Sequence, residues 1–395
     1  MSTRYLVLRA NKPSSESFQY ASLGAWSDPT NGLTIEVREE DLGELRADPR
    51  NIEVVDSDIV LSLLKPTARA VTSTPSLIEA ESVQLPPGLH ALGAHTTHCS
   101  GDGVTVAVLD TGIDVDHPVF QGARICPRNF TKEGSDSDVS DTSGHGTHCA
   151  GTICGRTVNG VRVGVAPGIS KLCVGKVLGT GGGTLEMLIQ AMYWAVIVEK
   201  ADVVSLSLGY DLPGNFERLI RTGLRTELAA QVVLRQQSQI IKSVSTLCAF
   251  LETQSPNVVF VAATGNESDR PGFTLDAGLP AAELFGVGAV GRSAVSTGRW
   301  EVARFSNGLA RVVAPGVDVL SAAKGGGWEV MSGTSMATPH VAGVAALWVE
   351  HLRTKKALSV PHSVCSTLQV TTDRELLVTT DTSAIGAGMV KAPQP

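Results

Sequence analysis

The sequence predicts an α/β fold of three layers, in which a mostly parallel sheet is covered by helices on both faces and preceded by a small α+β unit. Five apolar runs are nearly continuous, as is typical of parallel strands buried on both faces. These runs are 104–109, 172–178, 203–208, 258–263 and 284–290. Helical stretches at 185–199 and within 218–252 lie between some of them. Strands that alternate with helices in this way form a parallel sheet with helices on each side.

Residues 1–81 have a different pattern of predicted secondary structure from the rest of the chain. Residues 1–65 are interpreted as the small α+β unit, with strands at 5–9, at 33–38 and at either 52–55 or 59–64. A helix is predicted at 39–47, because Asp41 stands near its start and Pro49 just past its end. Residues 66–81 are rich in Thr, Ser and Pro and are interpreted as a linker and processing region. The main domain is then 82–395.

The composition excludes several classes of protein. The 395 residues carry a net charge of −7, which offers no basic surface for nucleic acid or anionic membrane. No run of about 18 apolar residues is present, so no membrane-spanning helix is expected. Seven cysteines are spread thinly and do not resemble a disulfide framework, and no secretory signal is recognisable. We therefore expect a cytoplasmic protein, or a secreted one if a leader has been removed.

A carboxylate and a histidine stand where predicted strands and helices meet. Asp110 ends the run at 104–109, and function gathers at the carboxyl ends of parallel strands. His145 lies between Gly144 and Gly146 at the start of a helix of small residues, so we expect its side chain at an exposed tip. A strand-end turn for Asp110 and a hydrogen-bonded structural role for His145 are the simpler alternatives.

A serine and an asparagine complete the set. Ser335 precedes an apolar helix, whose free N–H groups favour developing negative charge, and Pro339 is expected in the first turn of that helix. Asn266 follows a buried run and can donate its amide to an oxyanion. The alternatives are an N-cap for Ser335, although Thr334 or Ser332 could serve instead, and a turn for Asn266.

These residues belong to motifs whose order and spacing are typical of one enzyme family. The motifs are DTGID at Asp110, GHGTHCAG at His145, GVAP at 164–167, SLSLG at 205–209, AATGN at 262–266, VAPG at 313–316 and GTSMATPHVAG at Ser335. The order Asp, His, Ser is that of subtilisin rather than of chymotrypsin. From about Gly101 to Gly388 the chain resembles the subtilisin-like serine proteases (subtilases), with some features of the proteinase K branch.

The resemblance implies a serine endopeptidase that hydrolyses peptide bonds through an acyl-enzyme. Ser335 would attack the carbonyl carbon, His145 would transfer the proton and Asp110 would orient His145. Asn266, with the Ser335 backbone N–H, would form the oxyanion hole. No cofactor is required by this implied chemistry.

The resemblance also implies a substrate cleft. Three glycines match the edge along which a substrate pairs as a strand: Gly181, Gly182 and Gly183. Two segments match the walls of the pocket for the residue before the cut: Ser207, Leu208 and Gly209, and Ala263, Thr264 and Gly265. The pocket floor is expected near Gly278 and Leu279, which predicts a neutral or apolar preference, while Asp276 leaves a basic preference open.

Some features depart from the family pattern. Val119 stands where a calcium ligand would be Asp, so the main family site is not supported, although Asp136, Asp138 and Asp141 could form another. The acidic run is equally a solvated loop. Cys149 resembles the free thiol of the proteinase K branch and is expected beneath the catalytic histidine as a buried structural group.

Two further regions are interpreted by position. Residues 1–65 resemble the family's inhibitory propeptide, which assists folding and occupies the cleft until it is cut, here within 65–81; a permanent accessory domain is the alternative. The segment 210–257 is longer than the family needs and carries an amphipathic helical run. It predicts a helix or helix pair packed on the domain, or a docking surface for a protein partner.

Two other functions remain open from the residues. The fold could serve as a catalytically silent binding module, although all four chemical residues are present. A metal site could also form from His145, His148 and Cys149, because their spacing superficially resembles a ligand cluster.

Overall fold

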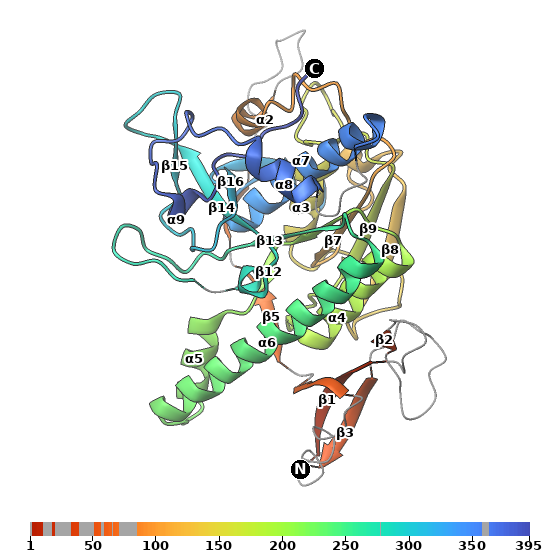
Figure 1. Ribbon diagram of the computed structural model, residues 1–395, viewed down its shortest axis with the longest axis vertical. Coiled ribbons are helices and arrows are strands. Elements are labelled where there is room, and N and C mark those ends of the chain that lie inside the picture. The colour runs from red at the N-terminus through yellow and green to blue at the C-terminus, as the bar shows by residue number, and fades with distance from the viewer. Residues whose placement is uncertain are drawn as a thin grey trace.

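The structure is a computed structural model that describes residues 2–10, 18–19, 33–38, 51–56, 59–64, 66–70, 85–276, 278–357 and 363–395. The helix expected at 39–47 lies outside these residues. An eight-stranded sheet forms the centre of the main domain, in the order β15-β14-β13-β11-β7-β9-β8, with β16 beside β14 (Figure 1). All neighbours are parallel except β14 and β15, as the predicted fold class requires.

The five predicted apolar runs correspond to strands of this sheet. They match β7 (Thr105–Asp110), β9 (Lys171–Lys176), β11 (Val203–Leu206), β13 (Val259–Ala263) and β14 (Phe285–Arg292). The sheet also contains β8 (Ile125–Asn129), β15 (Trp300–Val302) and β16 (Val312–Pro315), which no predicted run covers. Strand β7 shows why its pattern does not alternate. Val106 and Val108 pack into one hydrophobic core and Ala107 and Leu109 into another, so both faces of the strand are buried.

Helices cover the two faces of the sheet (Figure 1). One core contains α3 (His145–Cys154) and α7 (Thr334–Thr354). The other contains α4 (Leu185–Tyr193), which continues as the π-helical segment η3 (Trp194–Val198), and α6 (Thr226–Gln254). Shorter elements complete the domain: α2 (Pro87–Leu92), η2 (Pro118–Phe120), η4 (Leu279–Ala282), α8 (Ser363–Val370) and α9 (Thr382–Ile385). No helix in the described part of the chain is both long and apolar enough to cross a membrane.

The long segment 210–257 contains a pair of helices. Helix α5 (Leu212–Arg221) leads into α6, and the two contact each other. Val244, Leu247 and Leu251 bury the second half of α6 in the domain core, whereas α5 buries no residue. The helix pair therefore packs on the domain at one end and projects from it at the other (Figure 1).

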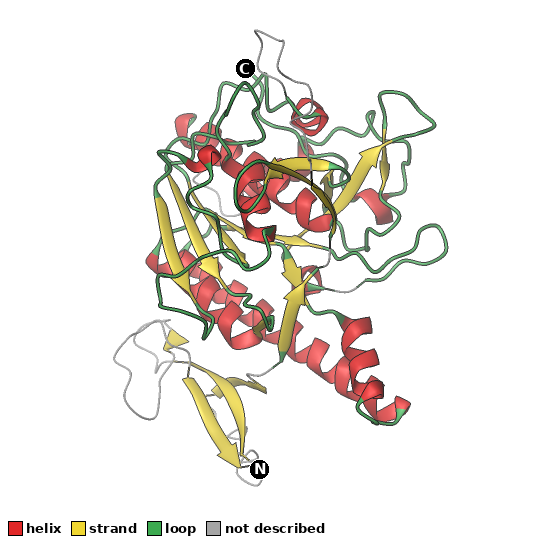
Figure 2. Cartoon of the chain, turned by 180° about the vertical axis from the view of Figure 1, so that it is seen from behind, coloured by secondary structure: helices red, strands yellow, loops and turns green. Residues whose placement is uncertain are grey.

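The N-terminal residues form a separate antiparallel sheet (Figure 2). Its strands are β1 (Ser2–Ala10), β2 (Phe18–Gln19), β3 (Leu33–Arg38) and β4 (Asn51–Asp56), with β1 paired to the other three. Strand β4 lies against α6. The strand predicted at 33–38 has the observed bounds, and both alternatives for the third strand are strands.

Two short strands carry the chain from this sheet across the main domain. Strand β5 (Val60–Leu63) lies between β10 (Gly183–Thr184) and β12 (Leu208–Gly209), antiparallel to both. Strand β6 (Thr67–Ala70) pairs with β18 (Trp328–Ser332), which also pairs with β17 (Val319–Ala322). Residues 67–70, within the segment interpreted as a linker, form a strand because the exposed edge of β18 supplies them with backbone partners.

Candidate active site

The carboxylate at the end of β7 and the histidine at the start of α3 form a buried pair. His145 Nδ1 lies 2.8 Å from Asp110 Oδ1, and both side chains are about 1–2% exposed. Helix α3 can approach β7 this closely only because Gly146 has no side chain. A Cβ there would lie 2.1 Å from the carbonyl oxygen of Gly112. The Gly-His-Gly setting is thus a packing requirement that brings His145 to Asp110.

His145 is buried, so the expectation of an exposed tip was wrong. Its burial by itself lowers the pKa, but the adjacent negative charge of Asp110 and the hydrogen bond to it prevail, and the pKa of His145 lies well above its usual value. The other ring nitrogen, Nε2, is buried and has no hydrogen-bond partner among the described residues. An imidazole held by a carboxylate with a free Nε2 can accept a proton from a nearby hydroxyl.

The hydroxyl expected from the sequence is that of Ser335, the second residue of α7, and the Cys149 thiol contacts both His145 and the Ser335 carbonyl. Ser335 Oγ lies 3.4 Å from the carbonyl oxygen of Ser207 and 3.5 Å from that of Leu64, and donates between them. Thr334 and Ser332, which the sequence offered as possible caps, do not cap the helix. The N-cap is Gly333, while the Thr334 hydroxyl donates to Asn266 and that of Ser332 accepts from the backbone of Asp318.

Asn266 is held with its amide turned toward the same space. Its Oδ1 accepts from the N–H (2.8 Å) and the hydroxyl (2.9 Å) of Thr334. The Thr334 hydroxyl in turn accepts from the N–H of Gly265. The Nδ2 atom of Asn266 lies close to Gly333, 3.3 Å from where a Cβ would stand. Asn266 is thus fixed to the residue before Ser335, with its amide nitrogen beside Gly333.

The residues matched to a substrate cleft flank strand β5. Gly183 pairs with Leu61, Leu208 with Leu63 and Gly209 with Ser62. Gly182 approaches the Leu61 carbonyl, whereas a Cβ at Gly181 would meet open space. Of the second wall, Ala263 ends β13, Thr264 donates to the Val287 carbonyl and Gly265 contacts Thr334 as described.

Leu64, the residue after β5, reaches the space between these walls. Its side chain is 3% exposed, and its Cδ2 lies 3.1 Å from the position of a Cβ on Gly209. The expected floor is adjacent, because a Cβ on Gly278 would stand 3.2 Å from the Thr264 carbonyl. Asp276 is exposed and directs its carboxylate at Gly308. The side chain that packs against Gly209 is therefore that of Leu64.

Cys149 lies beneath the histidine. Its Sγ is 3.8 Å from His145 Nδ1 and donates to the carbonyl of Ser335 at 3.5 Å, and burial raises the pKa of its thiol. The alternative metal site of His145, His148 and Cys149 does not form. His148 Nε2 bonds to the Val319 carbonyl instead, and the atoms near one another at this point are those of Asp110, His145 and Cys149.

In the acidic loop before α3, carboxylates accept hydrogen bonds from backbone N–H groups. Asp141 accepts hydrogen bonds from the hydroxyls of Thr111 and Thr147 and from three N–H groups, of Ser143, Gly144 and Thr147. Burial raises its pKa, but these hydrogen bonds outweigh that and lower it. The carboxylate of Asp138 accepts a hydrogen bond from the N–H of Ser140. The backbone carbonyl of Asp136 accepts one from the N–H of Asn129. Val119 is fully buried. Asp141 thus holds the loop that presents His145.

Sequence reasoning missed several contributors to this site. The Ser207 hydroxyl donates to the Ser335 carbonyl at 3.0 Å, although only its backbone had been singled out. Pro339 is inside α7 rather than in its first turn. Thr334 lies within the GTSMATPHVAG motif and Asp141 in the acidic run, but nothing in the sequence indicated the hydrogen bonds that they make.

A buried imidazole–carboxylate pair, a hydroxyl at a helix N-terminus and an extended segment lying along two edge strands together define a serine hydrolase that acts on peptides. Comparison with known proteins agrees. The model of the subtilase family matches residues 101–391. The chain belongs to the subtilase family, and it is a serine endopeptidase.

Individual relatives have similar activities. The chain is 36% identical over 280 residues to an intracellular serine protease of Paenibacillus polymyxa, covering 68% of this chain and 74% of the relative. It is 35% identical over 277 residues to the major intracellular serine protease of Bacillus subtilis, covering 67% and 75%. It is 33% identical over 324 residues to subtilisin E of the same species, covering 80% and 70%.

Proposed function

We propose that this endopeptidase is made as a zymogen whose residues 1–64 inhibit it in cis and are removed by its own cut between Leu64 and Lys65. The observation that carries the proposal is the position of Leu64. Its carbonyl oxygen lies 3.5 Å from Ser335 Oγ, while β5 before it is paired on both sides. A segment held in this way is bound as a substrate is, up to the bond that would be cut.

The roles of the site residues follow from the geometry. Ser335 Oγ turns from the Ser207 carbonyl to His145 Nε2, gives it the proton and attacks the Leu64 carbonyl carbon. Asp110 holds Nδ1–H and stabilises the imidazolium, which then protonates the leaving amine of Lys65. Asn266 and the Ser335 N–H stabilise the oxyanion. Water and the same histidine then hydrolyse the acyl-enzyme. The chain supplies every group in these steps, so no cofactor is needed.

We propose an apolar preference for the residue before the cut. Leu64 is almost completely buried against Gly209, and Leu61, three residues earlier, is 1% exposed. Burying two leucine side chains stabilises the complex by about 2 kcal/mol each. A basic side chain would find Asp276 exposed and directed at Gly308. The cut after Leu64 moves the processing bond to just before the region 65–81 expected from the sequence.

We also place the enzyme in the cytoplasm. All seven cysteines are free. Burial raises the pKa of Cys154 to about 12 and raises the pKa values of Cys173 and Cys248 far above the usual thiol value, so these thiols stay protonated and unreactive, as suits a reducing compartment. Two of the relatives above are named intracellular proteases.

Intact-mass spectrometry of the full chain tests the zymogen. Wild type should yield a fragment ending at Leu64 and a mature chain beginning at Lys65, and the mature chain should gain one fluorophosphonate mass. Ser335→Ala should stay whole and unlabelled. A fragment ending elsewhere, or processing of purified Ser335→Ala, would contradict the proposal.

Two variants of strand β5 sharpen the test. Leu64→Asp places a charge in the closed pocket and should slow processing by at least about 100-fold. Val60→Asp is the matched control, because Val60 is in the same strand but 48% exposed, and it should be processed at the wild-type rate. Residues 1–64 added to the mature enzyme should inhibit it, and the Leu64→Asp version should inhibit it far less. Equal behaviour of the two variants would contradict the assignment of Leu64.

A further inference from the structure

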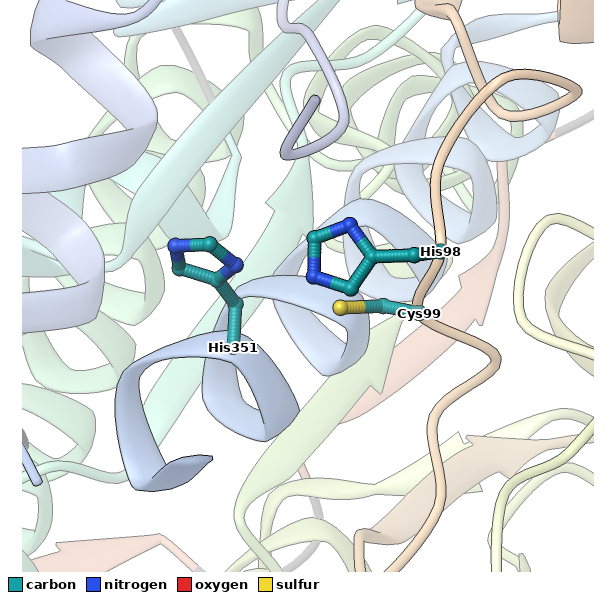
Figure 3. Close-up of side chains that lie close together, drawn as sticks. All are labelled: His98, Cys99 and His351. Atoms are coloured by element: carbon teal, nitrogen blue, oxygen red, sulfur yellow. The ribbon is translucent and has the colours of Figure 1, made fainter. Parts of the chain in front are cut away.

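Three potential metal ligands meet on the main domain, far from the cleft. Figure 3 shows His98 and Cys99 projecting from one extended segment toward His351, which lies near the C-terminal end of α7. One ligand atom from each residue lies within 4.8 Å of the others. The two imidazole rings are 5.4 Å apart, with planes tilted by 57°. Residues 252 positions apart in sequence thus bring two imidazoles and a thiol to one point.

Ordinary structural contacts leave ligand atoms unused in this cluster. Nδ1 of His351 is buried and has no hydrogen-bond partner among the described residues. Leaving such an atom unpaired costs about 1–3 kcal/mol, so an occupant that accepts its lone pair would be favoured. Cys99 is 6% exposed, whereas His98 faces solvent, which leaves a path for an ion.

The surrounding contacts hold the two segments in place. The carboxylate of Glu350, next to His351, accepts from the N–H groups of Ser100 (2.8 Å), Gly101 (2.6 Å) and Asp102 (3.1 Å). These three bonds fix the chain just after Cys99 to the end of α7. On the other side the ring of Trp348 packs edge-on against that of His351 at 5.3 Å. The positions of the ligands are therefore set without the ion, as an effective metal site requires.

We infer that His98, Cys99 and His351 form a binding site for a borderline-soft divalent cation, Zn²⁺ above all, which fastens the start of the main domain to the end of the helix that carries Ser335. Two imidazoles and one thiolate suit zinc, with water in a fourth, open position. Ligand atoms around tetrahedral zinc stand about 3.3–3.6 Å apart, given bonds of about 2.0–2.3 Å. Rotation of the exposed His98 closes the remaining gap, and the Cys99 thiol releases its proton to solvent on binding.

Cobalt titration of the full-length Ser335→Ala protein tests the site, because this protein does not digest itself. Co²⁺ alone should give a thiolate-to-metal charge-transfer absorption and the d–d bands of tetrahedral cobalt, and Zn²⁺ should abolish both by displacement. His98→Gln should weaken binding by at least about 100-fold, since it removes a ligand from an exposed position where folding does not depend on it. Cys99→Ser should remove the charge-transfer band.

Two controls decide where the ion binds. His95→Gln changes an exposed histidine outside the cluster and should leave the titration unchanged. Cys149→Ser changes the thiol of the cleft and should also leave it unchanged. Loss of the band in Cys149→Ser but not in Cys99→Ser would overturn the inference, as would the absence of tetrahedral bands in the parent. Zn²⁺ should raise the Tm of the parent and not that of His98→Gln; equal shifts would again overturn it.

Discussion

The carbonyl oxygen of Ser335 and the ring nitrogen of Pro339 stand four residues apart in α7, where a helix would ordinarily form a backbone hydrogen bond. Proline has no N–H, so the Ser335 carbonyl is left free. The hydroxyl of Ser207 donates to it at 3.0 Å and the thiol of Cys149 at 3.5 Å. Ser207 and Cys149 are thereby both tied to the backbone of Ser335.

This relationship predicts a coupling between Ser207 and Pro339. In the Ser335→Ala protein, which keeps the backbone carbonyl, Ser207→Ala should lower the free energy of unfolding by about 1 kcal/mol. With Pro339→Ala also present, the N–H of Ala at that position can bond to the carbonyl, so the cost of Ser207→Ala should fall. A double-mutant cycle by urea unfolding measures the difference. Equal costs in the two backgrounds would show that the hydroxyl does not replace the missing helix bond.

The contact between Leu64 and Gly209 predicts the size preference of the mature enzyme. Gly209→Val fills space that a leucine side chain uses, so the ratio of kcat/KM for substrates with Leu against Ala before the cut should fall by about tenfold or more. Gly181→Val is the control, because a Cβ there meets nothing within 4 Å and should leave the ratio unchanged. Chromogenic peptides that differ at this one residue provide the measurement. An unaltered ratio in Gly209→Val would place Leu64 outside the primary pocket.

The environment of His145 predicts how self-processing depends on pH. In the intact chain the pKa of His145 is raised because the charge of Asp110 outweighs burial, and only the neutral ring can accept the Ser335 proton. The processing rate should therefore rise with pH, with a midpoint above 6.5. Timed intact-mass measurements across a pH series give the profile. A midpoint below 6.5 would show that burial, rather than Asp110, dominates.

Two other buried histidines predict the acid stability of the fold. Burial lowers the pKa of His148 to about 3 and that of His340 to about 4. The unfolded chain binds protons at these residues below pH 6.5, whereas the native protein does not, so stability is complete above 6.5 and is lost as pH falls. The full effect is roughly 3–5 kcal/mol for each histidine.

Urea unfolding of Ser335→Ala between pH 6.5 and 4 checks this expectation. His340→Gln should flatten the dependence, and the exposed His95→Gln should not. A stability that stays constant over this range would mean that both rings are protonated without unfolding.

Much of the fold could be predicted because its signals are local. Strands such as Val203–Leu206 are buried on both faces, so every position must be apolar or small, and the run is recognisable without knowing its neighbours. The motifs around Asp110, His145 and Ser335 are equally local, because each side chain must follow a strand or begin a helix among glycines that permit close approach. These features can therefore be predicted from a short stretch of sequence.

The family resemblance implied that the N-terminal unit occupies the cleft, but which residues pair with the two walls could not be predicted from local sequence. Strand β5 is held by Gly183 and Gly209 through backbone hydrogen bonds, which almost any residue can make, so the sequence at 60–63 does not specify its partner. The strand at 67–70 has the same cause, because its partner β18 is distant in the sequence.

The amino-acid sequence by itself determined the fold class, the family and the four residues on which the proposed chemistry rests, since periodicity and spacing act over a few residues. Only the tertiary structure decided that Leu64 reaches Ser335, that Ser207 donates to the Ser335 carbonyl, and that His98 and Cys99 meet His351. Each of these contacts joins residues more than 100 positions apart. Such contacts depend on the path of the whole chain. Local propensities do not specify which distant group will accept a given hydrogen bond or complete a given set of ligands.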